Sequence, residues 1–210
     1  MTKVKICGIT NLADALAACE AGADALGFNF AIEARPKGRY IDPEDAQRII
    51  DQLPPWVYTV AVCVNEPQER VAEFLAFCDW VQLHGEETPE FCEPFADRTI
   101  KAFRARPGFE PGWMLEYSTS LYLLDAYVPN MHGGTGKMCD LDLAKEAIAM
   151  GRPLILAGGL TPENVAGVIR EVQPYAVDVA GGVESGPGAK DHRRMKDFVR
   201  NAKNSLFLPG

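Results

Sequence analysis

Strand-like and helix-like segments alternate along the whole chain, and this alternation limits the possible folds more than any other feature. Segments rich in β-branched, aliphatic or aromatic residues recur eight times, at 4–7, 24–30, 58–64, 80–84, 99–103, 120–125, 153–157 and 176–180. Helical patterns with start signals such as Asn11, Asp42-Pro43, Thr88-Pro89 and Thr161-Pro162 lie between them. This order predicts a parallel sheet with right-handed crossovers, and eight repeats are the number that closes a (β/α)8 TIM barrel.

An open doubly wound sheet is the competing arrangement. Dinucleotide-binding sheets of that kind carry G-x-G-x-x-G after their first strand, whereas the glycine clusters here follow the late strands. No low-complexity linker or change in composition divides the 210 residues. We therefore expect residues 1–210 to form a single barrel domain with a parallel eight-stranded core.

The charge balance argues against large anionic partners. Lys and Arg number 21 against 29 Asp and Glu, a formal charge of −8, so neither nucleic acid nor a membrane surface is an expected partner. Asp14, Glu20 and Asp24 interrupt the apolar residues of the first 30, and no later apolar run approaches the roughly 20 residues of a membrane span. We expect a soluble cytoplasmic protein that binds a small anion at a local site.

The cysteines and histidines do not have metal-site spacing. The six cysteines include no C-x-x-C pair, and the three histidines stand apart at 84, 132 and 192. A structural metal and a disulfide framework are both unexpected. We interpret Cys19, Cys63, Cys78 and Cys92 as small core residues.

Polar residues at the carboxyl ends of strands mark the expected site, because TIM barrels carry their chemistry there. The apolar pairs Val4/Ile6, Val81/Leu83 and Val177/Val179 each share one face of their strand under period-two alternation. If those pairs pack on the helices, five polar side chains point into the barrel mouth: Cys7, Gln82, His84, Asp125 and Asp178.

Glycine pairs follow the seventh and eighth strands, as AGGL (157–160) and AGGV (180–183). Paired glycines allow close approach of a ligand to backbone N–H groups, and these two loops commonly bind phosphate in barrels. The predicted phosphate site comprises Gly158, Gly159, Ala180, Gly181 and Gly182, with 183–186 as the short helix beside it. A third cluster, HGGTGK at 132–137, lacks Walker spacing, and we assign Gly133, Gly134 and Gly136 to a mobile loop over the site.

Several motifs together resemble the phosphoribosylanthranilate isomerase family of tryptophan biosynthesis. They are KICGIT (5–10), LGFNF (26–30), RYI (39–41), VNEP (64–67), VQLHGEE (81–87), LLD (123–125), GGTGK (133–137), LAGGLTPENV (156–165) and VDVAGGVES (177–185) followed by PG and KDH. They occur in family order over nearly the whole chain. The resemblance implies a TIM barrel that performs an Amadori rearrangement of a phosphosugar substrate without metal or cofactor, as a monomer or homodimer.

The resemblance also implies roles for individual residues. Asp125 corresponds to the general acid that opens the furanose ring, and Cys7 to the general base that removes the C2′ proton. These roles require an Asp pKa raised above about 4 and a thiol pKa lowered below about 8.5. Burial can raise the pKa of the carboxyl group, and cationic or N–H neighbours can lower that of the thiol.

The family binds the anthranilate carboxylate with an arginine in an S-x-R-Y stretch. Here the chain reads EARPKGRY (33–40), so Arg39 matches that arginine, while Lys37 stands at the serine position and Arg35 is a rival. A guanidinium can bind a carboxylate through two parallel hydrogen bonds. Two further departures are AGGVE (180–184) for the usual SSGVE, which removes two hydroxyl donors, and CDL (139–141) for FDW.

Other strand-end residues keep two interpretations each. Three of them are either substrate contacts or structural groups: Gln82, His84 and Asp178. Lys5 is either a member of a buried ion pair or a Schiff-base lysine. The ion pair is favoured, because the substrate carries its own nitrogen. Three alternative functions remain: the related histidine-pathway isomerase, which uses a carboxylate where Cys7 stands; a metal-dependent phosphopentose epimerase; and a non-catalytic phosphate-binding barrel.

Overall fold

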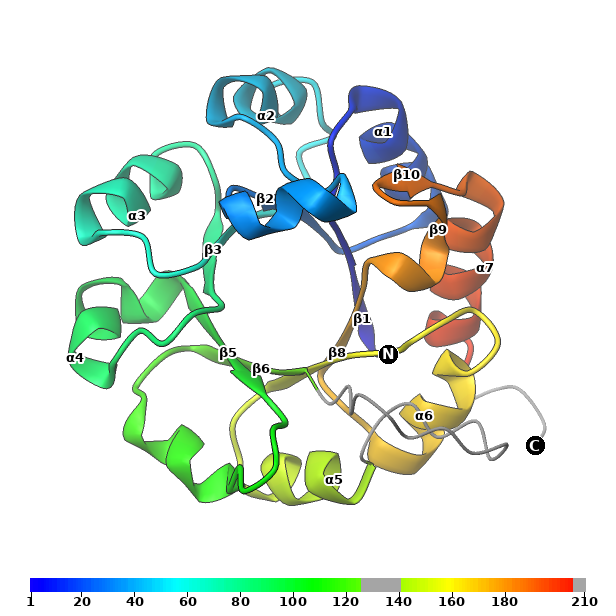
Figure 1. Cartoon of the computed structure of the whole chain (residues 1–210). Helices are drawn as coiled ribbons and strands as arrows, with labels where there is room; N and C mark the ends of the chain where they lie inside the picture. Colours follow the sequence, from blue (N-terminus) through cyan, green and yellow to red (C-terminus); the bar gives the residue numbers. More distant parts are fainter. Residues whose placement is uncertain (126–140, 206–210) are drawn as a thin grey trace.

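The computed structural model describes residues 1–125 and 141–205. It contains a closed barrel in which each strand pairs in parallel with its sequence neighbours, and β1 closes the ring on β8. Figure 1 shows the strands as an inner ring surrounded by helices. The predicted barrel is therefore confirmed, and the open sheet is excluded. The barrel strands are β1 Lys3–Cys7, β2 Ala25–Asn29, β3 Tyr58–Cys63, β4 Trp80–Leu83, β5 Thr99–Arg104, β6 Leu121–Asp125, β7 Leu154–Ala157 and β8 Ala176–Val179.

The helices follow the predicted order, with some short helical turns among them. The α-helices are α1 Leu12–Ala21, α2 Pro43–Ile50, α3 Gln68–Leu75, α4 Pro89–Cys92, α5 Leu141–Ala149, α6 Val165–Val172 and α7 His192–Lys203. The 3-10 helices are η1 Ile32–Lys37, η2 Glu93–Arg98, η3 Pro111–Glu116 and η4 Gly181–Val183. A small hairpin, β9 Glu184–Gly186 with β10 Ala189–Lys190, precedes α7.

Local sequence accounts for most of these helix starts. The Asn11 side chain accepts a hydrogen bond from the backbone N–H of Asp14 at 2.9 Å, and Thr88 caps α4 in the same way. Two expectations were wrong. Helix α6 begins at Val165 rather than directly after Pro162, because the Asn164 side chain bonds back to the Thr161 N–H and holds a turn there. The short helix beside the predicted phosphate loop is 181–183, whereas 184–186 pairs as a strand.

The strand alternation separates two apolar layers. Val4, Ile6, Val81, Leu83, Val177 and Val179 belong to the larger cluster between barrel and helices. A smaller cluster inside the barrel contains Leu123, which is two residues before Asp125, and Ala176, which is two before Asp178. Asp125 and Asp178 therefore share the inward face of their strands, above the interior cluster. Of the four cysteines interpreted as core residues, Cys63, Cys78 and Cys92 are buried and Cys19 is half-buried.

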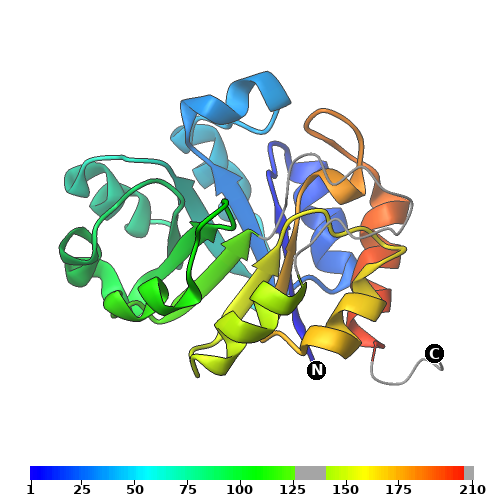
Figure 2. The same cartoon turned by 60° about the horizontal axis from the view of Figure 1, so that its bottom comes forward.

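All barrel strands run in one direction, so their carboxyl ends form one mouth. In Figure 2 the strand arrowheads point toward the end that carries η1 and η4, and the N-terminus lies at the opposite end. Within residues 1–125 and 141–205, no helix is long and apolar enough to cross a bilayer.

Candidate active site

A cavity of about 820 Å³ occupies the barrel mouth. All five strand-end polar residues line it, so the side chains follow the predicted inward face: Cys7, Gln82, His84, Asp125 and Asp178. A second cavity, of about 560 Å³, lies between the loops that follow β4 and β5, and neither Cys7 nor Asp125 lines it. The mouth cavity is therefore the candidate site, and its two proposed reacting groups come from β1 and β6.

Cys7 ends β1 directly opposite Gly27 of β2. A Cβ on Gly27 would lie 2.8 Å from the Cys7 Sγ and 3.0 Å from the Lys5 Nζ, so the missing side chain leaves room for both atoms. Burial raises the pKa of the Cys7 thiol, while the Lys5 ammonium acts in the opposite direction. The lowered pKa that a general base needs is therefore not found: burial outweighs the cation, and neutral pH favours the thiol.

Lys5 is a buried ion-pair member. Its Nζ donates to the Asp178 Oδ1 at 3.0 Å, and both side chains lie almost entirely out of solvent. Burial opposes the charged form of Lys5, but the adjacent Asp178 and Cys7 together outweigh it and raise the pKa of Lys5. Lys5 does not line the cavity, whereas Asp178 does. Asp178 therefore separates the lysine from the cavity.

Gln82 and His84 form a pair on the inward face of β4. The Gln82 Nε2 and the His84 Nδ1 are 2.9 Å apart. Burial, followed by the charge of Arg104, lowers the pKa of His84 to about 3. A neutral Nδ1 can accept the amide proton, which points the Gln82 Oε1 the other way. That oxygen is buried and has no hydrogen-bond partner within the described residues, while Gln82 as a residue lines the cavity.

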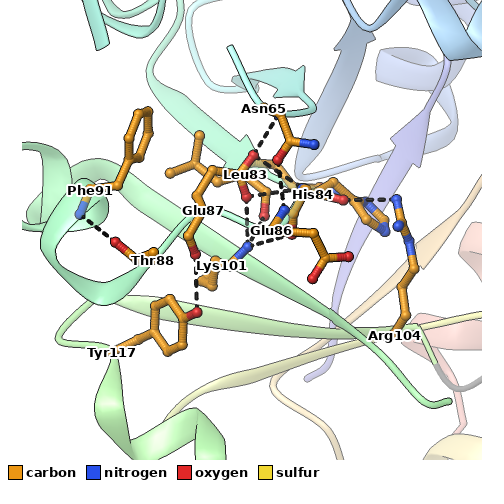
Figure 3. Close-up of polar contacts among 12 residues, drawn as sticks. Asn65, Leu83, His84, Glu86, Glu87, Thr88, Phe91, Lys101, Arg104 and Tyr117 are labelled. Carbon is orange, nitrogen blue, oxygen red and sulfur yellow. Dashed lines mark hydrogen bonds and ion pairs between the residues drawn. The ribbon is translucent and has the colours of Figure 1, made fainter. Parts of the chain in front are cut away.

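Polar contacts from β5 and from the loop after β3 hold the loop after β4, as Figure 3 shows. The Lys101 Nζ, on the outward face of β5, donates to the Glu87 Oε2 at 2.7 Å and to the Gly85 carbonyl at 2.9 Å. The other Glu87 oxygen accepts from the Asn65 N–H at 2.9 Å. Arg104 donates to the His84 carbonyl at 2.8 Å. This network fixes the backbone that carries His84. Our sequence analysis did not predict it. The available signal was the lysine inside the otherwise apolar TIKAF segment.

Arg39 and Arg35 occupy different environments. Arg39 lines the cavity, and its Nε and Nη2 donate to the two carboxylate oxygens of Glu184, each at 2.8 Å. The Arg35 guanidinium lies over the Tyr40 ring, 4.3 Å from its centroid, and does not line the cavity. Of the two candidates, only Arg39 can reach a ligand in the mouth without rearrangement.

The two glycine loops meet at the cavity wall. Gly158, Gly159, Ala180, Gly181 and Gly182 all line the cavity. A Cβ on Gly182 would lie 1.8 Å from the Leu160 carbonyl oxygen, so the loops pack as closely as backbones can. Gly158 and Gly159 have φ values of 97° and 66°, a conformation that glycine adopts without strain.

Arg194 is a cavity residue that our sequence analysis missed. It belongs to the first turn of α7, lines the cavity, and donates from its Nε to the Gly182 carbonyl at 3.1 Å. A cation in a first helical turn opposes the helix dipole, and this was the available signal in the DHRR stretch (191–194). The predicted mobile loop, with Gly133, Gly134 and Gly136, lies outside the described residues.

Comparison with known proteins identifies the family, and with it the reaction class, of this barrel. The family model for N-(5′-phosphoribosyl)anthranilate (PRA) isomerase matches residues 4–201. The chain belongs to the PRA isomerase family. It is therefore an isomerase of tryptophan biosynthesis, as the sequence motifs predicted.

Individual PRA isomerases match over their whole length. The chain is 52% identical to the enzyme of Trichlorobacter lovleyi, over 98% of this chain and 100% of that protein. It is also 52% identical to the enzyme of Geobacter sulfurreducens, over 97% of this chain and 99% of the relative. This full coverage extends the family assignment to both halves of the barrel.

Solved PRA isomerases share the fold. The crystal structure of the Thermotoga maritima enzyme has a TM-score of 0.84 at 45% identity and covers 97% of this chain and 100% of that chain. A PRA isomerase in complex with reduced 1-(o-carboxyphenylamino)-1-deoxyribulose 5-phosphate has a TM-score of 0.81 at 42% identity, with coverage of 97% and 100%. Another structure describes monomers generated from the dimeric T. maritima enzyme. A 2-keto-3-deoxy-6-phosphogluconate aldolase of Zymomonas mobilis, at 14% identity and a TM-score of 0.63, is similar in fold alone.

Proposed function

We propose that this chain converts N-(5-phosphoribosyl)anthranilate to 1-(2-carboxyphenylamino)-1-deoxyribulose 5-phosphate, the third step from chorismate to tryptophan. Asp125 is the general acid and Cys7 the general base. The observation that carries this proposal is that both side chains, from β6 and β1, line one cavity large enough for a phosphosugar with an aromatic ring.

The reaction divides into two proton transfers. Asp125 gives its proton to the furanose ring oxygen, the C1′–O bond breaks, and the nitrogen lone pair forms the C1′=N bond of a Schiff base. The Cys7 thiolate then takes the C2′ proton, and the electron pair of that bond moves through C1′ to the nitrogen. The resulting enol form rearranges to the ketone.

The thiolate required for the second step depends on Lys5. The Lys5 ammonium favours the thiolate form of Cys7, against the burial that disfavours it. Asp178 competes for the same ammonium. We propose that ribose hydroxyls of the substrate engage Asp178 and weaken its hold on Lys5, so that the ammonium is more available to the sulfur once substrate is bound.

The remaining contacts distribute along the length of the substrate. The phosphate binds to main-chain N–H groups of 158–159 and 180–182, with Arg194 as the cation nearby that offsets the missing hydroxyl donors of the AGGVE loop. The anthranilate carboxylate binds to Arg39 rather than Arg35. Gln82 offers its unpartnered oxygen to a substrate N–H or hydroxyl group, and the neutral His84 orients that amide.

One phosphosugar thus contacts residues from β1 to α7. For this reason we propose that 1–210 acts as a single domain, in the cytoplasm where the pathway operates, as a monomer or homodimer. A non-catalytic barrel would keep the phosphate loops without needing an acid and a base in the same cavity.

A fluorescence assay tests the function directly, since the anthranilate ring makes the substrate fluorescent. The purified chain should consume phosphoribosylanthranilate generated in the cuvette, and coupling to the next enzyme should remove the product. Absence of turnover, with inorganic phosphate still bound, would favour the non-catalytic barrel instead.

A further inference from the structure

The Arg39 guanidinium, which follows β2, is held in place by a carboxylate that follows β8. Its Nε and Nη2 each donate at 2.8 Å to one oxygen of Glu184, which stands 145 positions later in the chain. The Glu184 side chain is only 6% exposed and that of Arg39 is 22% exposed. Such a bidentate pair fixes the plane of the guanidinium as well as its position.

A second cation holds Glu184 from behind. The Lys190 Nζ donates to the Glu184 Oε1 at 2.8 Å and to the Ala180 carbonyl at 3.2 Å, and its side chain is 0% exposed. Burial opposes ionisation of Glu184, but the hydrogen bonds and charges of Arg39 and Lys190 together outweigh it, and the pKa of Glu184 is lowered. Two cations share one carboxylate, so the group retains one net positive charge beside the cavity.

Glycines leave room for the Arg39 side chain. A Cβ on Gly181 would lie 2.8 Å from its Nη2, and a Cβ on Gly8 would lie 3.1 Å from its Cδ. Gly8 follows the proposed base Cys7, and Gly181 belongs to the proposed phosphate loop. The position of Arg39 is therefore set between the two regions that contact the opposite ends of the sugar.

We propose that Glu184 is a positioning residue for Arg39: by occupying the Nε and Nη2 edge, it leaves the Nη1 side of the guanidinium for the substrate carboxylate. This inference rests on the proposed role of Arg39. Glu184, which is itself held by Lys190, is then a determinant of specificity for a carboxylated aromatic amine. An acidic residue near an acidic substrate would ordinarily weaken binding.

The charge change and the positioning effect predict opposite results for Glu184→Gln. The variant gains one positive charge near the cavity, which by Coulomb attraction alone would tighten binding of the anionic substrate. However, the Gln amide presents an N–H₂ donor to Arg39 or Lys190, both donors themselves, so the bidentate pair is lost. We expect KM to rise about tenfold with kcat changed less than about twofold.

A substrate without the ring carboxylate, made from aniline and ribose 5-phosphate, isolates the effect. The preference for the carboxylated substrate should fall in Glu184→Gln and in Arg39→Ala, while inhibition by inorganic phosphate stays unchanged. Glu87→Gln is the matched control, because it breaks a comparably buried ion pair with Lys101 outside the mouth cavity and should leave the preference intact.

Arg39→Lys gives an independent result if Glu184→Gln does not fold. A lysine is shorter and lacks the planar fork that pairs bidentately with Glu184 while a further edge faces the substrate, so this variant should lose as much of the preference as Arg39→Ala. A Glu184→Gln enzyme with unchanged or lower KM, or an Arg39→Lys enzyme with the wild-type preference, would overturn the positioning role. If Arg39→Ala itself keeps the preference, the proposed carboxylate contact fails instead.

Discussion

Lys5 and Asp178 form a buried ion pair of 3.0 Å beside the Cys7 thiol, and Asp178, but not Lys5, lines the cavity. Only the lysine of this pair favours the thiolate form of the buried sulfur. Burial raises the pKa of Cys7, and the strongest influence against burial is the Lys5 ammonium. Lys190 acts in the same direction, whereas Asp178 acts with burial.

Lys5→Met should therefore raise the pKa of the Cys7 thiol further. The thiolate forms only as the pH rises through that pKa, so at pH 8 the variant should react about tenfold more slowly with iodoacetamide, for a shift of about one unit. Mass spectrometry of the Cys7 peptide across pH 7–10 measures this. Lys3→Met, on the same strand but exposed and paired with Asp24, is the control. Identical alkylation profiles for both variants would remove Lys5 from the account.

His84 should not titrate in the working pH range. Its pKa is lowered to about 3, so the ring is neutral from pH 5 to 9 and its charge cannot shape the activity profile there. His84→Gln is expected to lower kcat/KM without moving either limb of its pH dependence. A limb near pH 6.5 that is present in the wild type and absent from the variant would show that the ring does become charged.

Arg39→Ala should raise KM far more than Arg35→Ala does. Loss of a charge-assisted hydrogen bond to a carboxylate corresponds to about 10- to 100-fold in binding. Arg35, stacked on Tyr40, should change KM by less than about threefold as an exposed charge. Steady-state kinetics of both variants in the fluorescence assay decide the question, and the reverse order would transfer the carboxylate contact to Arg35.

Gly182→Ala should damage phosphate binding. The added Cβ would fall 1.8 Å from the Leu160 carbonyl oxygen, so one of the two phosphate loops must move. We expect a higher inhibition constant for inorganic phosphate and a lower melting temperature. Gly167→Ala is the control within α6, where an added Cβ meets nothing within 4 Å and should stabilise the fold by about 0.5–1 kcal/mol. Unchanged phosphate inhibition in Gly182→Ala would argue against the loop as the phosphate site.

The barrel and the inward face of its strands could be predicted from the sequence, because both depend on local periodicity. Period-two alternation is enough to place Cys7 and Asp178 on the cavity side, and an Asn cap or a Thr-Pro pair is enough to start α1 or α4. Local signals did not predict the start of a helix where a side chain forms a hydrogen bond with a nearby backbone group. The Asn164 bond to Thr161 delayed α6 in this way.

The missing parts of the site depend on partners distant in the chain. The Arg39–Glu184 and Lys101–Glu87 ion pairs depend on the strands being in register, and no spacing in the sequence predicts them. The direction of the Cys7 pKa is a balance between burial and Lys5, and that balance depends on depth in the barrel rather than on residue type. The family motifs identified Cys7 and Arg39, but they could not predict the ion pairs or the direction of the pKa shift.

The central claim is that Asp125 and Cys7 act on different bonds of one sugar. The most direct measurement is the primary isotope effect on kcat with substrate deuterated at C2′. Cys7→Ser and Asp125→Asn should each lower kcat by roughly 10² or more. The isotope effect should be fully expressed in Cys7→Ser, because proton removal limits the rate, and should approach unity in Asp125→Asn, because ring opening limits it. Full activity in Cys7→Ser, or the opposite pattern of isotope effects, would contradict the account.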